Sequence, residues 1–248
     1  MSASKKNNSA IAICIQEPFE DGSSMNLGVI QGDDLLFLHQ AFITDTIKHA
    51  LDVPSCDVIL YYINQPDRVR LVKIVTKYLS EKFSEKTATD FKKRFKSVKL
   101  DKNRWGMRIE QVFKNCFNLG YKHVLVIGSR TPTVHSSKMK TALKMLKESD
   151  AVFGPTPEGR YYLIGMSEEY KINLSEFDWK SPAIYSKVAD AFSAKGLAWS
   201  ELEIWYCVES SDELELMVRD INQWRFENYE TVANETEIAL EHILSKLE

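Results

Sequence analysis

The sequence predicts a single α/β domain, 248 residues long, with a mostly parallel β-sheet and helices on both faces. Six short apolar runs are nearly continuous rather than alternating, which is typical of strands covered on both faces. Between most of these runs, apolar residues recur every three or four positions, which indicates amphipathic helices. Because strands and helices alternate along the chain, crossover connections between parallel strands are expected.

The predicted strands are the six apolar runs, each bounded by polar residues. In chain order they span residues 10–15, 57–62, 123–128, 150–154, 161–166 and 203–208. Their lengths are typical of strands rather than of buried helices.

The predicted helices follow from apolar spacing and from end signals. In residues 107–118 a single apolar stripe runs from Ile109 to Phe117, and Gly120 is placed to end the helix. A second helix is predicted near 136–148. Two later helices are predicted to start with capping boxes, at 210–213 and 234–237.

Composition excludes several classes of protein. The 32 Lys and Arg residues against 35 Asp and Glu residues give a net charge of −3, so nothing draws the whole chain to nucleic acid. The four cysteines are dispersed and mostly lie in apolar runs, as buried thiols do in a reducing compartment. No apolar run approaches the roughly 20 residues of a membrane span, and none near the start suits a signal peptide. We expect a cytoplasmic protein with a flexible tail at 1–9 and one domain at 10–248.

Residues 80–105 form a basic segment with interleaved Phe83, Phe91 and Phe95. Alternating basic and aromatic residues can bind nucleic acid. The stronger interpretation is a helix whose aromatic residues face the core and whose cations, Lys92, Lys93, Arg94 and Lys96, are solvated. We therefore expect no nucleic-acid partner.

Polar residues follow three of the predicted strands. Open parallel sheets bind ligands beyond the carboxyl ends of their strands. The loops after 123–128, 150–154 and 203–208 are therefore predicted to bring Arg130, Glu158, Arg160 and Glu209 into one polar cluster.

Five motifs occur in a fixed order over more than 100 residues. They are WGMR (105–108), GSRTP (128–132), GPTPEGRYYLIG (154–165), WKSP (179–182) and CVESSDEL (207–214). Their order and spacing resemble the selenodomain-associated, glycosyltransferase-like family, a branch of the nucleotide-diphospho-sugar transferases with the GT-A fold. The resemblance implies a GT-A-like domain, a nucleotide or nucleotide-sugar ligand, and carboxylates that hold a divalent cation.

The chain departs from the family pattern at the residues expected to do the chemistry. The Asp of the family's Gly-Ser-Asp is Arg130 here, and arginine cannot coordinate a metal ion. The family's Asp-Gly-Gly is residues 158–160, Glu-Gly-Arg, and its late Asp-x-Asp pair is Cys207 and Glu209. The loop at 17–36 has five acids and no Lys or Arg, whereas the family has a basic nucleotide-binding element there. We expect neither a metal nor another cofactor.

These departures predict a GT-A-like protein with a degenerate active site, which has lost conventional metal-dependent transfer. It is expected to keep a nucleotide, nucleotide sugar or other anionic ligand in the cleft. Arg130 and Arg160 are predicted to form an anion-binding pair, and Arg108 and Ser129 are further candidate ligand-binding residues. For Arg108, an ion pair with Glu110 is an equal alternative.

Two other functions stay open. An active, metal-independent glycosyl- or nucleotidyltransferase would use Arg130 in place of the cation. Its candidate catalytic residues are Glu158, as a base or acceptor-orienting group, and Glu209, which would order the cluster. A non-catalytic interaction module would dock partners through the acidic C-terminal helix and four aromatic residues, Trp199, Trp205, Trp224 and Phe226.

Other polar residues are weaker candidates. Asp45 lies in an apolar helical stretch, so it is predicted to bond within a helix interface rather than to act as a base. The five histidines have no metal-binding spacing, so no zinc site is expected. Ser129 is predicted on an exposed loop that is not a nucleophile elbow, and the sequence places no His near it.

Overall fold

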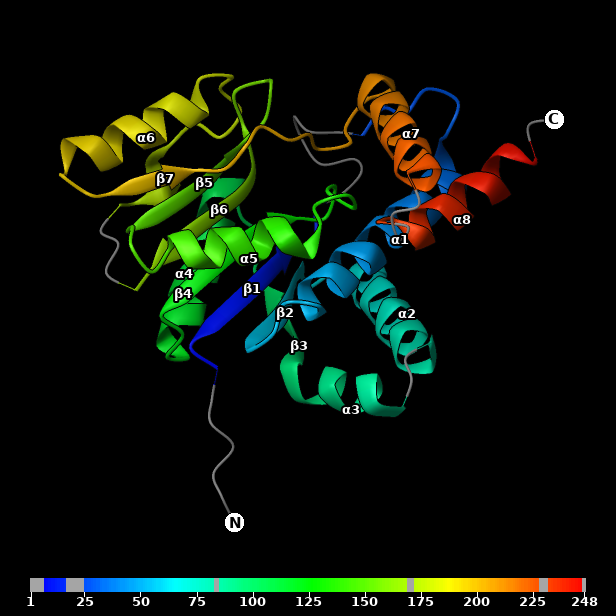
Figure 1. Cartoon of the computed structure of the whole chain (residues 1–248), viewed down its shortest axis with the longest axis horizontal. Coiled ribbons are helices and arrows are strands. Elements are labelled where there is room, and N and C mark those ends of the chain that lie inside the picture. Colours follow the sequence, from blue (N-terminus) through cyan, green and yellow to red (C-terminus); the bar gives the residue numbers. More distant parts are fainter. Residues whose placement is uncertain (1–6, 17–24, 83–84, 169–171, 228–231, 247–248) are drawn as a thin grey trace, which may run out of the picture.

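The computed structural model describes the chain except for residues 1–6, 17–24, 83–84, 169–171, 228–231 and 247–248. Most of the predicted tail and three of the loop acids, Glu17, Glu20 and Asp21, therefore lie outside the described residues. The described part forms one seven-stranded sheet in the order β3-β2-β1-β4-β6-β5-β7 (Figure 1).

Six strands of the sheet run in one direction. β1 to β4 are mutually parallel, β7 is parallel to β5, and β6 is antiparallel to both of its neighbours, β4 and β5. The strands are β1 (Ser9–Cys14), β2 (Cys56–Ile63), β3 (Phe95–Leu100), β4 (His123–Gly128), β5 (Ala151–Pro155), β6 (Tyr161–Ser167) and β7 (Trp199–Glu201). The mostly parallel α/β fold predicted from the sequence is confirmed.

Eight α-helices and one 3-10 turn connect these strands in the described residues. They are α1 (Gly32–Leu51), α2 (Pro66–Lys82), α3 (Glu85–Arg94), α4 (Trp105–Asn118), α5 (Ser136–Met145), η1 (Leu174–Glu176), α6 (Ile184–Ala194), α7 (Ser211–Phe226) and α8 (Asn234–Leu244). Gly120 follows α4 with a φ of 85°, as expected for the residue that ends it. No helix in the described ranges is both long and apolar enough to cross a membrane.

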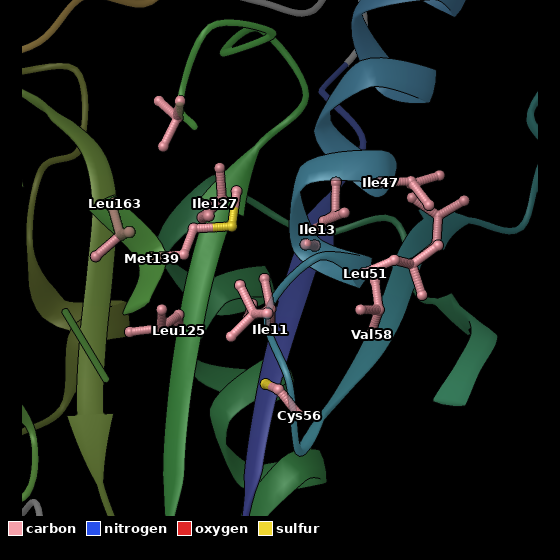
Figure 2. Close-up of a cluster of buried hydrophobic side chains, with 14 of the residues drawn as sticks. Ile11, Ile13, Ile47, Leu51, Cys56, Val58, Leu125, Ile127, Met139 and Leu163 are labelled. Atoms are coloured by element: carbon pink, nitrogen blue, oxygen red, sulfur yellow. The ribbon is translucent and has the colours of Figure 1, made fainter. Parts of the chain in front are cut away.

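Helices cover both faces of the sheet, so its strands are apolar on both sides. One core contains residues of α1, α2, α3 and α5, and Figure 2 shows part of it, with Ile11 and Ile127 of the sheet near Ile47 and Met139. The other core contains residues of α4 and α6. A third cluster joins α1, α7 and α8, which gather on the right of Figure 1.

The predicted strand at 203–208 is wrong. β7 lies earlier, at Trp199–Glu201. Beyond β7 the chain passes the ends of other strands and makes only isolated backbone hydrogen bonds to them. Trp205 N–H donates to the Pro155 carbonyl and Val208 N–H donates to the Arg130 carbonyl. The run is apolar because Tyr206 and Val208 are buried in the third cluster, not because they belong to the sheet.

The predicted helix is also wrong at Phe95, because α3 ends at Arg94 and β3 begins at the next residue. Arg94 is not solvated: its guanidinium donates to the carbonyls of Leu51, Val53 and Cys56, and 13% of its side chain is exposed. β3 is the edge of the sheet, where exposed lysines disfavour pairing with another strand.

The two predicted capping boxes have different outcomes. The box at the start of α7 is confirmed, with reciprocal bonds between Ser210 and Glu213. At α8 the N-cap is Ala233, which makes no side-chain cap bond. The buried carboxylate of Asp45, on α1, accepts the N–H groups of Glu235 and Thr236 at 3.1 and 2.8 Å. The predicted helix-interface role of Asp45 is confirmed.

Of the four aromatic residues of the predicted docking face, only Phe226 is largely exposed. Trp205 is partly buried, as its place in an apolar run predicts, and the expected exposure of Trp199 and Trp224 is wrong. Trp205 stacks on Trp224 with ring centroids 6.5 Å apart, and both are partly buried beside the third cluster. Trp199 packs on Phe153 in the second core. Phe226 is 89% exposed, which leaves no continuous aromatic surface among these residues.

Candidate functional site

A cleft of about 1470 Å³ opens at the carboxyl ends of the central strands. Gln16 lines it just after β1, Gln65 after β2 and Gly128 at the end of β4, while Trp105 lines it at the start of α4. This is the edge where an open parallel sheet binds ligands. Other lining residues come from the loop at 156–160 and from residues 102–104, 175–180 and 207–213.

Glu209 bridges two arginines at the strand ends. Its Oε1 accepts from Arg130 Nη1 at 3.0 Å and its Oε2 accepts from Arg160 Nη1 at 2.9 Å. The Arg130 side chain is 0% exposed, whereas 41% of the Arg160 side chain is exposed and lines the cleft. Three of the four predicted cluster residues are therefore in direct contact.

The remaining member, Glu158, is exposed and lines the same cleft. It belongs to a tight turn in which Thr156 N–H donates to the Arg160 carbonyl at 2.9 Å. Gly159 has a φ of 74°, and a Cβ there would lie 2.1 Å from the Pro182 carbonyl oxygen. Both the backbone conformation and the close approach therefore require glycine at this position.

Arg130 and Arg160, predicted as an anion-binding pair, share the carboxylate of Glu209 but differ in exposure. Arg130 is covered by the protein, so of the two only Arg160 lines the cleft. Arg108 does line the cleft, with its guanidinium 5.0 Å from the centre of the Trp105 ring. The carboxylate of Glu110 accepts from Lys114 Nζ and from Ser175 N–H.

Ser129 is buried rather than exposed, and a histidine does lie beside it. His39 Nε2, on α1, is 2.9 Å from Ser129 Oγ, which also accepts the Gln16 N–H at 3.0 Å. Burial, with the positive charges of Arg130 and Arg68, lowers the pKa of His39 to about 3, so the ring is neutral near pH 7. Because Ser129 is 0% exposed, this hydrogen bond lies inside the protein, next to the loop that carries Arg130.

Two tryptophans that were not predicted as site residues, Trp105 and Trp179, line the cleft. Trp179 donates from Nε1 to the Leu174 carbonyl at 2.8 Å and lies against Gly106 in the first turn of α4. A Cβ at Gly106 would be 2.2 Å from that indole nitrogen. The signal was present, because Trp105 and Trp179 each begin one of the five motifs.

The residues at the strand ends do not fit a divalent cation. Both oxygens of Glu209 already accept from guanidinium groups, and Arg130 carries a fixed positive charge beside them. Desolvation, reinforced by the negative charge of Glu209, raises the pKa of Cys207, so its thiol is neutral near pH 7. In the described part of the chain, no three His, Cys, Asp or Glu residues are grouped to hold a metal ion.

The sheet order and the cleft at its carboxyl edge define a GT-A-like α/β protein, and solved structures share this fold. A Desulfovibrio desulfuricans G20 protein, provisionally assigned as a nucleotide-diphospho-sugar transferase, has a TM-score of 0.71 and 20% identity, covering 95% of this chain and 98% of that one. CMP:2-keto-3-deoxy-manno-octonic acid synthetase complexed with CTP has a TM-score of 0.54 and 12% identity, covering 87% of this chain and 99% of that one.

The mannosyltransferase PcManGT from Pyrobaculum calidifontis, in complex with GDP-Man and Mn²⁺, has a TM-score of 0.52 and 9% identity. The similarity covers 79% of this chain and 55% of that one. At these identities the likeness establishes the fold. The chain itself belongs to the DUF2064 family, described as uncharacterized proteins conserved in bacteria, whose profile matches residues 46–181. No curated protein matches the sequence.

Proposed function

We propose that this protein binds a nucleotide or nucleotide sugar in the cleft without a divalent cation, and that it does not perform conventional metal-dependent transfer. The observation that carries the proposal is the Arg130–Glu209–Arg160 bridge at the strand ends. Related folds bind CTP or GDP-Man, the latter with Mn²⁺, which supports a nucleotide-type ligand. A cytoplasmic location, in keeping with four free thiols, is part of the proposal.

The physical reason is competition for one carboxylate. A cation bound by Glu209 would have to displace at least one guanidinium, and the Arg130 charge would stay buried beside it. Two like charges in a poorly solvated site repel strongly. The ion-pair network therefore disfavours a metal even when a nucleotide brings its phosphates.

Isothermal titration tests this proposal with UDP, CTP and UDP-glucose, each in EDTA and in Mn²⁺. We expect at least one ligand to bind with a dissociation constant that changes less than about threefold between the two conditions. Tight binding that appears only with Mn²⁺ would refute the proposal. The same titrations are repeated with a Glu209→Gln variant. If the variant binds the ligand in EDTA as tightly as the unmodified protein does, the ligand does not need this carboxylate.

A second candidate function is metal-independent transfer, and the exposed pair of Glu158 and Arg160 in the cleft favours it. Arg160, not Arg130, would meet a departing phosphate, and Glu158 would take the acceptor proton. Incubation with nucleotide sugars and analysis of the released nucleoside diphosphate tests this function. Turnover in EDTA that is lost in Arg160→Gln and Glu158→Gln supports it. Absence of turnover in EDTA rejects the function, and turnover retained in both variants rejects the roles of these two residues.

A further inference from the structure

The charges that line the cleft are unevenly distributed. At the strand ends the lining contains one exposed cation, Arg160, and three carboxylates, Glu158, Glu209 and Glu213. The wall formed by the start of α4 and by the segment that follows η1 has more cations than acids. Its cations are Lys102, Arg104, Arg108 and Lys180, and its acids are Glu176 and Asp178.

The acids of this wall already have partners. Glu176 Oε1 accepts from Asn173 Nδ2 at 2.7 Å, and Asp178 Oδ1 accepts from the backbone N–H of Lys180 at 3.1 Å. Within the described ranges, Lys102, Arg104 and Lys180 take part in no ion pair and are exposed to solvent. Their charge is therefore available to a ligand that enters the cleft.

The same wall offers flat apolar surface. Trp105 and Trp179 are half-buried and line the cleft, and Trp179 is held by its bond to the Leu174 carbonyl and by its contact with Gly106. Arg108 is 5% exposed and stacks near Trp105, which fixes a cation beside an aromatic face. Behind them, Ile109 and Ile164 give the cleft an apolar floor.

We infer that this cationic and aromatic wall, defined by Lys102, Arg104, Trp105, Arg108, Trp179 and Lys180, is the subsite for a phosphate carried on a ring compound. The phosphate binds the cations and the ring lies against the indoles. The inference rests on the proposed function and deepens it, because it places the phosphate away from the strand-end arginines. Nucleotides and sugar phosphates share this chemistry.

Electrostatics favours this wall over the strand ends. A phosphate beside Arg160 would also be near Glu158, Glu209 and Glu213, whose three negative charges exceed the two positive charges of Arg160 and the buried Arg130. At the wall formed by the start of α4 and the segment after η1, the cations outnumber the acids. The N-cap of α4, Arg104, makes no side-chain cap bond, so the positive end of that helix adds to the same field.

Titration of paired variants tests the inference, with UDP, glucose 6-phosphate and inorganic phosphate as probes. The first variant is Arg104→Ala with Lys180→Ala, and both residues are exposed, so folding is preserved. Its matched control is Arg70→Ala with Lys73→Ala, two exposed cations of α2 that do not line the cleft. The third variant is Arg160→Gln.

We expect the first variant to weaken binding of the phosphorylated ring compounds by about tenfold or more, and the control and Arg160→Gln to change it less than about threefold. Trp179→Phe should weaken UDP more than inorganic phosphate. If UDP binds and depends on Arg160 but not on the first variant, the proposed function stands and this inference is overturned.

The inference about the subsite can also stand when the proposed nucleotide function fails. If no nucleotide binds but glucose 6-phosphate does, and its binding depends on Arg104 and Lys180, the inference stands and the nucleotide function fails. If neither these probes nor CTP nor UDP-glucose binds to the unmodified protein, both are overturned. Binding of inorganic phosphate alone, with no gain from a ring, overturns the aromatic part of the subsite and with it the inference.

Discussion

Arg130 and Glu209 form an ion pair of 3.0 Å at the end of β4, and the arginine has no exposed surface. The Arg130 carbonyl also accepts the Val208 N–H at 2.8 Å, so the side chain and the backbone of one residue hold the same segment. A guanidinium in this position cannot lose its charge by deprotonation. Its fixed charge therefore makes Glu209 a structural partner as well as a cleft residue.

Glu209→Gln should destabilise the fold much more than Arg160→Gln does. The first change leaves the buried Arg130 charge without a carboxylate and should lower the free energy of unfolding by about 3 kcal/mol. The second removes a partly exposed cation and should cost less than about 1 kcal/mol. Urea-induced unfolding at pH 7 measures both. Equal losses in the two variants would mean that the buried pair contributes no more than the exposed one.

Acid should destabilise the protein through His39. Its pKa is lowered to about 3, mainly by burial, so the folded state disfavours the proton that the unfolded state binds below its ordinary pKa near 6.5. The stabilising effect is present above pH 6.5 and is lost as the pH falls toward 3. Between pH 7 and pH 5 the loss from this residue should be about 2 kcal/mol.

His39→Gln keeps a polar group next to Ser129 but does not titrate. The variant should show a shallower fall in the free energy of unfolding between pH 7 and pH 5 than the unmodified protein. Some slope should stay, because burial also lowers the pKa of His49 to about 4. An unchanged pH dependence in the variant would show that His39 is not the group that resists protonation.

The strands that could be predicted from the sequence are those whose own residues are apolar because both faces of the strand are buried. β1, β2, β4, β5 and β6 each lie within about one residue of a predicted run, because strands covered on both faces are apolar throughout. The prediction failed where a distant element supplies the partner. The run at 203–208 is apolar because it packs against α7 and α8. Arg94 is largely covered because three carbonyls near the end of α1 accept hydrogen bonds from its guanidinium.

The candidate site also has features that could be predicted from the sequence and features that could not. Convergence of the strand-end loops follows from sheet topology, so contacts among Arg130, Arg160 and Glu209 could be anticipated. Burial of Arg130 could not, because it depends on packing between segments far apart in the sequence, as the bond between His39 and Ser129 illustrates. No local pattern records such a contact.

Asp45 should contribute to stability as the cap of α8. Asp45→Ala removes the acceptor for two N–H groups at the helix start and should lower the free energy of unfolding by about 2 kcal/mol. Asp45→Asn keeps one amide oxygen and should lose less. Ser210→Ala, which removes the local cap of α7, is the matched comparison, with a loss of about 1 kcal/mol. If Asp45→Ala costs no more than Asp45→Asn, the carboxylate does not act as the cap.

Gly106→Ala should reverse the usual effect of this substitution. In a helix interior, alanine normally stabilises by about 0.5 to 1 kcal/mol relative to glycine. Here the new Cβ would lie 2.2 Å from Trp179 Nε1 and 2.9 Å from the Leu174 carbonyl oxygen, so we expect a loss of about 2 kcal/mol from overpacking.

A double-mutant cycle with Trp179→Ala isolates the contact between α4 and the segment after η1. Removing the indole relieves the closer clash, so the double variant should be more stable than the sum of the single losses predicts, by about 1 kcal/mol. Urea-induced unfolding of the four proteins gives this coupling. Additivity within about 0.5 kcal/mol would mean that Trp179 does not rest on Gly106, and the cleft would then lack the fixed aromatic wall on which its ligand subsite depends.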